Sequence, residues 1–183
     1  MSIDIAEVFA NGRPLVLEPG QIIFRTGDLV RSMFYVTTGE LDLLRHTPNG
    51  APLILNRAVS GFVLAEASAY SRSYHCDCVA RDQSCLRSLT VGEFHEVLRK
   101  SPELAGSWAA QLAASLQKAR MLSEIRALRT VSERLDAWLS DNGQLPPRGQ
   151  IQHIAHMLGV SREALYRELA KRRAKSKSTM AGG

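Results

Sequence analysis

The stretch "QIQHIAHMLGVSREALYREL", residues 150–169, is the most informative part of the sequence, because it contains two short helical segments separated by a glycine. Four apolar residues of the first segment follow an i, i+3, i+4, i+7 spacing and share one face: Ile151, Ile154, Ala155 and Leu158. Gly159 permits a sharp turn, and Ser161 can cap the second helix. Leu165 and Leu169 can then pack back on the first helix. The pattern predicts a helix-turn-helix.

The outward side of the second helix is polar. Glu163, Tyr166 and Arg167 share a face, with Arg162 at its edge. Arginine can grip a guanine edge with two hydrogen bonds, and Glu can accept one from a cytosine amino group. The predicted DNA-contacting residues are Ser161, Arg162, Glu163, Tyr166, Arg167, Lys171 and Arg172. Lys171 and Arg172, with Arg173 on the same turn, could reach phosphates. The alternative is a solvated helix with a Glu163–Arg167 ion pair.

The charge distribution favours a polyanionic partner at one end. From residue 120 onward there are 12 Lys and Arg against 6 Asp and Glu, whereas the preceding part has 11 against 12. A basic segment attached to a neutral one suggests a polyanionic partner such as double-stranded DNA, and the alternative is a solvated basic tail. We find no secretion signal and no apolar run of the roughly 18 residues that a membrane span needs. We therefore expect no membrane partner. Because the three cysteines are an odd number and no secretion signal is found, we expect a reduced cytoplasmic setting.

Residues 13–95 read as short strands separated by turn clusters such as "RTGD" and "TTGE" at intervals of about 10 residues. The segments "QIIF", "MFYV", "LDLLR", "PLILN" and "CLRSL" are rich in β-branched or aromatic residues or alternate in polarity. Evenly spaced short strands predict a β-roll or barrel rather than a parallel α/β sheet.

From Pro102 to about Arg129 the apolar residues recur three or four apart, which predicts one amphipathic helix of about 25 residues. Its stripe consists of Leu104, Trp108, Leu112, Leu116, Ala119, Leu122 and Ile125. Pairing with the same helix of a second copy would bury this stripe. The alternative is a helix that packs only on its own domain. A further helix is expected before Asn142-Gly143.

Strands, a long helix and a helix-turn-helix in this order resemble the Crp/Fnr family of bacterial transcription regulators. "GQIIFRTGDLVRSMFYVTTGELDLLR" resembles the family's first roll strands, and "GVSREALYREL" resembles its recognition helix. The resemblance implies an α+β fold with a double-stranded, jelly-roll-like β-roll as sensor (1–100), a dimerisation helix (101–130) and a helix-turn-helix domain (131–183). It also implies a homodimer on a two-fold operator, with RNA polymerase as a partner.

Residue by residue, Arg162, Glu163 and Arg167 match the Arg-Glu-x-x-x-Arg pattern of the cyclic-AMP-type members. The resemblance therefore implies half-sites like TGTGA. Tyr166 stands where the redox-sensing branch has serine. An enzyme is not expected, because the sequence has no Gly-rich phosphate loop, no nucleophile elbow and no paired-histidine motif.

The effector pocket departs from the family pattern, in which a Gly-Glu pair and an Arg-Ser pair hold the cyclic nucleotide. Glu66 is present, but Ala65 replaces the glycine, and Tyr74-His75 align with Arg-Ser. A buried phosphate without its guanidinium would lose about 1.5–3 kcal/mol. We therefore expect that cyclic AMP is not the effector. The candidate pocket residues are Glu66, Arg72, Ser73, Tyr74 and His75, and the alternative is a cyclic-nucleotide-responsive activator that uses Arg72.

Two features remain open in the sequence. Cys76, Cys78 and Cys85, with His75, could form a metal, haem or redox sensor, or the cysteines could simply pack in the roll. The spacing is not a standard zinc pattern, so the cofactor stays unknown. After the recognition helix, "AKRRAKSKSTMAGG" has no strand pattern, which predicts little or no β-hairpin wing and a flexible basic tail.

Overall fold

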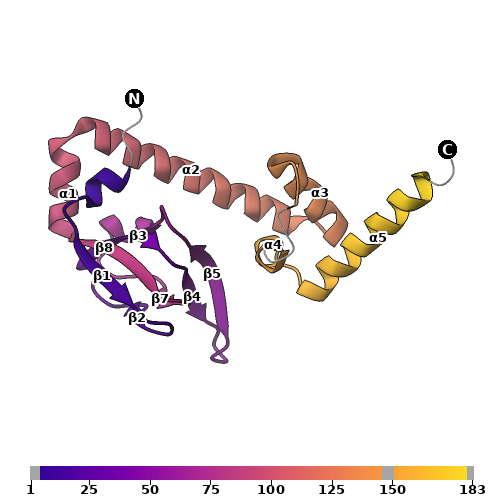
Figure 1. Cartoon of the computed structure of the whole chain (residues 1–183), viewed down its shortest axis with the longest axis horizontal. Coiled ribbons are helices and arrows are strands. Elements are labelled where there is room, and N and C mark those ends of the chain that lie inside the picture. The colour runs from indigo at the N-terminus through magenta and orange to yellow at the C-terminus, as the bar shows by residue number, and fades with distance from the viewer. Residues whose placement is uncertain (1–4, 146–150, 181–183) are drawn as a thin grey trace. The chain divides into compact units, whose positions relative to one another are not determined.

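The computed structural model describes residues 5–145 and 151–180, without the side chains of 152, 153 and 175–180. The chain forms two compact units, Met1–Ala113 and Ala114–Gly183. The elements, labelled in Figure 1, are η1 (Ile5–Phe9), β1 (Arg13–Leu17), β2 (Ile22–Phe24), β3 (Ser32–Thr38), β4 (Leu41–His46), β5 (Pro52–Ala58), β6 (Val63–Leu64), η2 (Glu66–Tyr70), β7 (Asp77–Ala80), β8 (Ser84–Thr90), α1 (Val91–Lys100), α2 (Pro102–Ala127), α3 (Val131–Asn142), α4 (Ile151–Leu158) and α5 (Arg162–Met180).

The first unit is a β-roll of two four-stranded antiparallel sheets, in the orders β1-β8-β3-β6 and β2-β7-β4-β5. All five segments that the sequence marked as strands lie on strands, and the predicted α+β fold is confirmed. The tight turn between β3 and β4 depends on Gly39, whose φ is +91°. A Cβ there would lie only 2.6 Å from the Cα of Ser84, so glycine alone fits.

Two apolar clusters hold this unit together. The first lies between the sheets and includes Phe24, Val36, Leu41, Tyr74 and Leu86. The second cluster joins η1, α1 and the beginning of α2 to the sheet β1-β8-β3-β6. Its members are Ile5, Val8, Phe9, Met33, Val63, Ala69, Leu89, Phe94, Leu98 and Trp108. The long helix therefore begins as part of the roll, because Trp108 packs edge-on against Phe94 with ring centroids 5.0 Å apart.

The second unit consists of the C-terminal part of α2 with α3, α4 and α5. Thr130 and Glu133 form a reciprocal capping box that starts α3. Ile125 near the end of α2 packs with Leu135, Leu158 and Leu165 of the three following helices. The long helix has 26 residues, close to the predicted length, and Leu116 in its middle is 52% exposed. No described helix is long and apolar enough to cross a membrane.

The C-terminal segment differs from the prediction of a flexible tail. Helix α5 begins at Arg162 and continues through Met180, so the basic segment 171–180 belongs to the same helix as the residues predicted to read DNA bases. The physical reason is composition: from Ser161 to Met180 the chain has no glycine or proline and is rich in Ala, Lys, Arg, Leu and Glu. Within the described residues no strand follows α5.

Candidate DNA-binding helix and effector site

The turn that precedes α5 is built by α4's own backbone. Gly159 adopts φ +63°, and its N–H donates to the carbonyl of His156 at 3.1 Å. The N–H of Val160 donates to the carbonyl of Ala155 at 3.0 Å. These two bonds form the Schellman arrangement that ends a helix and redirects the chain. The glycine singled out in the sequence therefore has the role predicted for it.

Ser161 caps the following helix, since its hydroxyl oxygen accepts a hydrogen bond from the N–H of Ala164 at 3.1 Å. Leu165 is fully buried and Leu169 nearly so, and both pack with Ile154 and Leu158 of α4. This packing fixes which side of α5 faces solvent. The hydroxyl hydrogen of Ser161 stays available to donate to a phosphate.

The outward face of α5 has two parts. Arg162, Glu163, Tyr166 and Arg173 line one hollow, in which the Arg162 guanidinium lies 5.5 Å from the centre of the Tyr166 ring. Arg167 and Lys171 line a second hollow beside the first turn of α3, together with Thr130, Val131, Ser132, Ala164 and Glu168. Within the described residues no ion pair joins Glu163 to Arg167, so the salt-bridge alternative has no support.

Arg172 differs from the prediction that it reaches phosphates. Its guanidinium donates to Asp136 at 2.6 Å, to Glu168 at 2.9 Å and to the carbonyl and hydroxyl of Ser132. These hydrogen bonds hold the pKa of Asp136 and of Glu168 below their usual values and raise the pKa of Arg172. Arg172 lies on the α3 side of the helix and is only half-exposed. It holds α5 on α3, and exposed Arg173 takes the outward position.

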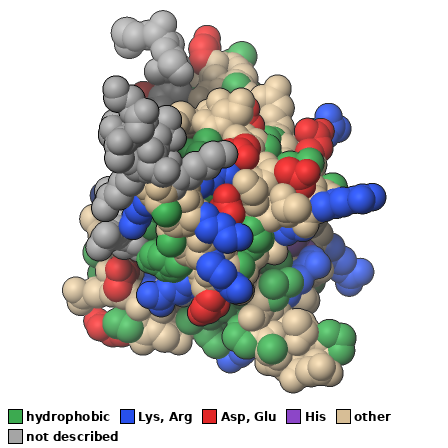
Figure 2. Space-filling model, turned by 90° about the vertical axis from the view of Figure 1, so that its right-hand side faces the viewer, with side chains coloured by type: hydrophobic (Ala, Val, Ile, Leu, Met, Phe, Trp, Pro, Cys, Tyr) green, Lys and Arg blue, Asp and Glu red, His purple; other side chains and the backbone are tan. Residues whose placement is uncertain are grey.

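On the face drawn in Figure 2, Lys and Arg side chains alternate with acidic and apolar ones instead of forming an unbroken basic patch. Four of the described cations of α5 have no ion-pair partner among the described residues: Arg162, Arg167, Lys171 and Arg173. Unpaired guanidinium and ammonium groups can bind phosphates or base edges without first breaking an internal bond.

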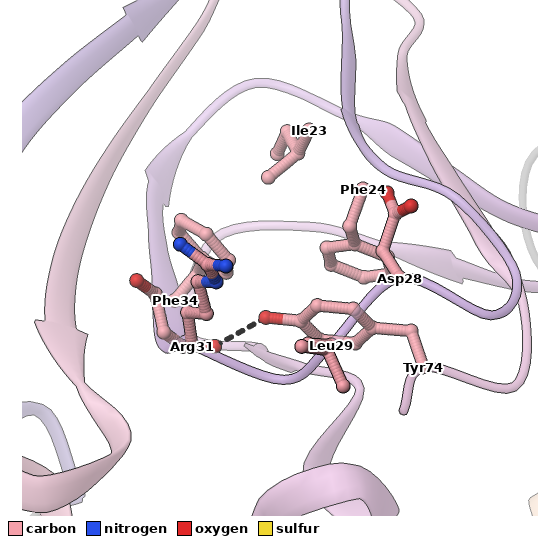
Figure 3. A pocket seen from close by; sticks show the side chains of 8 residues that line it. Ile23, Phe24, Asp28, Leu29, Arg31, Phe34 and Tyr74 are labelled. Carbon is pink, nitrogen blue, oxygen red and sulfur yellow. Dashed lines mark hydrogen bonds between the residues drawn. The ribbon is translucent and has the colours of Figure 1, made fainter. Parts of the chain in front are cut away.

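The roll contains an open cavity of about 370 Å³ between β2, β3 and the segment before β7 (Figure 3). Apolar and aromatic side chains form most of its wall, with Asp28 and Arg31 as the charged groups. Its lining residues are Ile23, Phe24, Asp28, Leu29, Arg31, Ser32, Phe34 and Tyr74. Of the five residues predicted to form the effector pocket, only Tyr74 lines this cavity.

Tyr74 is buried and held on all sides. Its ring stacks on Phe24 with centroids 3.9 Å apart, and its hydroxyl donates to the carbonyl of Ser32 at 2.5 Å (Figure 3). Its backbone N–H donates to Asp28, and its carbonyl accepts from Gly27. Burial raises the pKa of the phenol, so the ring is neutral at physiological pH. At the position where the resemblance places a phosphate-binding arginine, this chain has a neutral aromatic side chain.

The other predicted pocket residues lie apart from the cavity. His75 is exposed, with its Nδ1 3.1 Å from the Ser68 hydroxyl. Arg72 is exposed and contributes only its carbonyl, which accepts from Val30. Ser73 forms an isolated bridge with Leu29. Glu66 is half-buried, and burial raises the pKa of its carboxyl despite nearby His75.

Ala65 stands where the family pattern has glycine, and it adopts a left-handed backbone with φ +50° and ψ 44° at the start of η2. A non-glycine residue in this region costs about 1 kcal/mol. Glycine adopts this backbone without such a cost, although the chain has alanine here.

The cysteines do not converge on one site. Cys76 and Cys78 are buried in the core between the sheets, whereas Cys85 lies on β8 of the other sheet and outside that core. Strand β7 begins only at Asp77, which is buried, so His75 and Cys76 precede the strand. Burial raises the pKa of the Cys76 and Cys78 thiols, which makes them poor nucleophiles. Among the described residues no cluster of His, Cys, Asp or Glu could hold a metal ion.

Comparisons with known proteins agree with this architecture. Residues 14–101 match the family model of the cyclic nucleotide-binding domain. Among curated protein sequences, none matches the chain. The c-di-GMP-responsive global regulator CLP of Xanthomonas campestris is 21% identical over 94% of this chain and 92% of its own, with a TM-score of 0.68.

Two further solved structures match over most of the chain. FixK2 of Bradyrhizobium japonicum is 16% identical over 90% of this chain and 86% of its own, with a TM-score of 0.70. The catabolite activator protein of Thermus thermophilus is 20% identical over 94% and 84%, with a TM-score of 0.57. Of these three relatives in fold, CLP is described as a global regulator and the Thermus protein as an activator. Residues 14–101 therefore resemble a cyclic nucleotide-binding domain, within a chain that has the fold of these Crp/Fnr-type structures.

Proposed function

We propose that this chain is a homodimeric, sequence-specific DNA-binding transcription regulator of Crp/Fnr type whose roll does not respond to cyclic AMP. The observation that supports DNA binding most directly is the state of α5. Arg162 and Arg167 are exposed and free of ion pairs on a helix that follows a Schellman turn and a serine cap. Such a regulator would act on RNA polymerase in the bacterial cytoplasm.

The base-reading residues in this proposal are Arg162, Glu163 and Arg167, at the positions that match the family pattern. The two arginines would donate to guanine, and Glu163 would accept from cytosine. Ser161, Lys171 and Arg173 would contact phosphates, which orient the protein without selecting a sequence. Tyr166, stacked under Arg162, lies close enough to restrict its guanidinium. The preferred operator would contain two TGTGA-like half-sites related by two-fold symmetry.

A binding experiment at several salt concentrations tests the proposal. Fluorescence anisotropy would compare a duplex with two TGTGA half-sites, a shuffled duplex of the same composition and a single half-site. We expect the palindrome to bind at least about 1000-fold more tightly than the shuffled duplex. Arg162→Ala should remove this preference, whereas the charge-matched Arg129→Ala should not. Equal binding to all duplexes, with the same salt dependence, would contradict sequence-specific recognition.

The proposed dimer interface is the exposed part of α2. Leu116 is half-exposed in the middle of a 26-residue helix, which leaves an apolar side chain in water unless a partner covers it. A second copy of the same helix offers a matching surface. Sedimentation equilibrium should give a dimer for the natural chain and a monomer for Leu116→Glu, with Gln117→Glu as the charge control. A monomer at high concentration would contradict the dimer.

The absence of a cyclic AMP response rests on Tyr74. The phenol ring stacked on Phe24 places a neutral group where the family's guanidinium would pair with the cyclic phosphate. Calorimetric titrations with cyclic AMP, cyclic GMP and c-di-GMP would test it, the last because CLP responds to that nucleotide. We expect no binding of cyclic AMP below millimolar concentration. Binding of cyclic AMP at micromolar concentration would contradict this part of the proposal.

The alternative activator that uses Arg72 makes the opposite prediction. Micromolar binding of cyclic AMP by the natural chain, abolished by Arg72→Ala, would replace our proposal. The exposed position of Arg72, outside the cavity wall, speaks against it. The metal, haem or redox sensor predicts a Soret band or stoichiometric metal in the purified protein. The separated, buried cysteines speak against it.

A further inference from the structure

The C-terminal end of α4 is completed by side chains from two other helices. The Schellman bonds use the carbonyls of Ala155 and His156, which leaves those of the next residues without a helical donor. Arg126 donates through Nε to Met157 at 2.8 Å and through a terminal nitrogen to His156 at 3.3 Å. Carbonyls at a helix C-terminus carry partial negative charge, so cationic donors are favoured there.

Arg134 completes the same end from the other side. One of its terminal nitrogens donates to the carbonyls of Leu158 and Gly159, both at 3.1 Å. Its Nε donates to the carbonyl of Leu128 at 2.9 Å, in the connection between α2 and α3. Arg134 is half-buried and ties together the beginning of α3, the preceding connection and the turn.

Arg126 has a different position, because it lies in the last turn of α2. Its stem lies over the turn glycine: a Cβ on Gly159 would meet the Cγ of Arg126 at 3.4 Å and its Cδ at 3.6 Å. Neighbouring Ile125 is buried in the same helix-turn-helix core. The end of the long helix is thus attached to the turn that positions α5, by an apolar contact at Ile125 and by a guanidinium at Arg126.

We propose that Arg126 is a positioning residue that fixes the rotation of the helix-turn-helix on the end of α2, and thereby the spacing of the two half-sites that a dimer accepts. This inference rests on the proposed function. In a dimer joined through α2, any looseness between α2 and the turn becomes uncertainty in where the second α5 meets DNA. One base pair of spacing rotates a half-site by about 35° around the duplex, so a small loss of rigidity changes which spacers bind.

The test measures spacer discrimination rather than affinity alone. Palindromic duplexes would carry the preferred half-sites with spacers changed by one and two base pairs in each direction. We expect the natural protein to prefer one spacer by at least about tenfold, an effect the size of one charge-assisted hydrogen bond. Arg126→Gln should reduce this preference to about threefold or less, with unchanged affinity for an isolated half-site. Arg129→Gln, which removes the same charge nearby, should keep the natural preference.

Two results separate this inference from the proposed function. If the natural chain shows no sequence preference or no dimer, the proposed function fails. If it prefers one spacer and folded Arg126→Gln keeps that preference, only the role of Arg126 is overturned. Circular dichroism would verify folding. Should Arg126→Gln unfold, Arg126→Lys decides: it keeps the charge and stem but not the planar fork, so we expect partial loss, and undiminished discrimination would overturn the inference.

Discussion

The two units of this chain differ in whether their candidate binding residues have partners inside the protein. In the roll, the position that would face a ligand is used internally: Tyr74 stacks on Phe24 and donates to Ser32. On α5, Arg162 and Arg167 have no ion pair among the described residues, while Arg172 beside them is fully engaged. The difference teaches that unpaired charge on an otherwise well-packed element is the better indicator of a binding surface. It yields four predictions.

The largest effect is expected inside the roll. Tyr74→Ala would leave a void against Phe24 and a carbonyl of Ser32 without its donor. We expect the free energy of unfolding to fall by about 3–5 kcal/mol, as for other large aromatic truncations. Tyr74→Phe should cost only about 1 kcal/mol, the value of the hydroxyl hydrogen bond. Urea denaturation followed by circular dichroism measures both, and equal losses would show that the ring stack contributes little.

Removal of a cation without an internal partner should weaken DNA binding and leave the free energy of unfolding nearly unchanged. Arg167→Ala should weaken binding to the palindrome by about 100-fold, because a dimer loses two base contacts. Its free energy of unfolding should stay within about 0.5 kcal/mol of the natural value, since no internal partner is lost. Anisotropy and urea titrations on the same preparation provide both numbers. A clearly destabilised Arg167→Ala would mean that the residue is structural.

Two adjacent arginines give a matched pair. Arg172→Gln should lower the free energy of unfolding by about 1 kcal/mol and leave the salt dependence of DNA binding unchanged. Arg173→Gln should leave stability unchanged and reduce the slope of log K against log salt by about 2 per dimer. Reversed behaviour of the two variants would show that α5 lies on α3 with another side inward.

The smallest effect concerns Asp77, a buried carboxylate that accepts hydrogen bonds from the N–H of Thr26 at 2.7 Å and its hydroxyl at 2.8 Å. These bonds hold the pKa of Asp77 below its usual value of 3.8. The stabilisation is therefore present above pH 3.8 and lost as the pH falls through the lowered pKa. We expect Asp77→Asn to be about 1 kcal/mol less stable at pH 6, with the difference shrinking towards pH 2.5. A constant difference across this range would contradict the assignment.

Much of the fold could be predicted because local pattern and tertiary structure agree. The glycine turns, the alternating strands and the three-to-four spacing of α2 each follow from residue type, and the turn at Gly159 follows from its tolerance of positive φ. The short strands β6 and β7 were harder. β6 has two residues, and β7 begins at Asp77 within the "YHCDC" segment, which contains no glycine or proline to mark where the strand starts.

The site was only partly readable, because sequence gives the periodicity of a helix but not which side a neighbour covers. Arg172 and Arg173 are adjacent basic residues, and only the position of Asp136 and Ser132 on α3 assigns the inner role to the first. The predicted effector pocket is a related case, because only Tyr74 of its five residues lines the cavity in the roll. An alignment with the family places Tyr74 at the phosphate-binding position, but its stack on Phe24 depends on a strand 50 residues away. The role of Arg126 at the turn had no sequence signal, since its acceptors are backbone carbonyls.

The length of α5 has a practical consequence. Its 19 residues extend about 28 Å as one rod, so no loop separates the residues proposed to enter DNA from Met180. An affinity tag or fluorescent protein fused directly after Met180 would be attached to the same helix as the proposed DNA-contacting residues. Such a fusion would need a long glycine-serine spacer to leave recognition undisturbed.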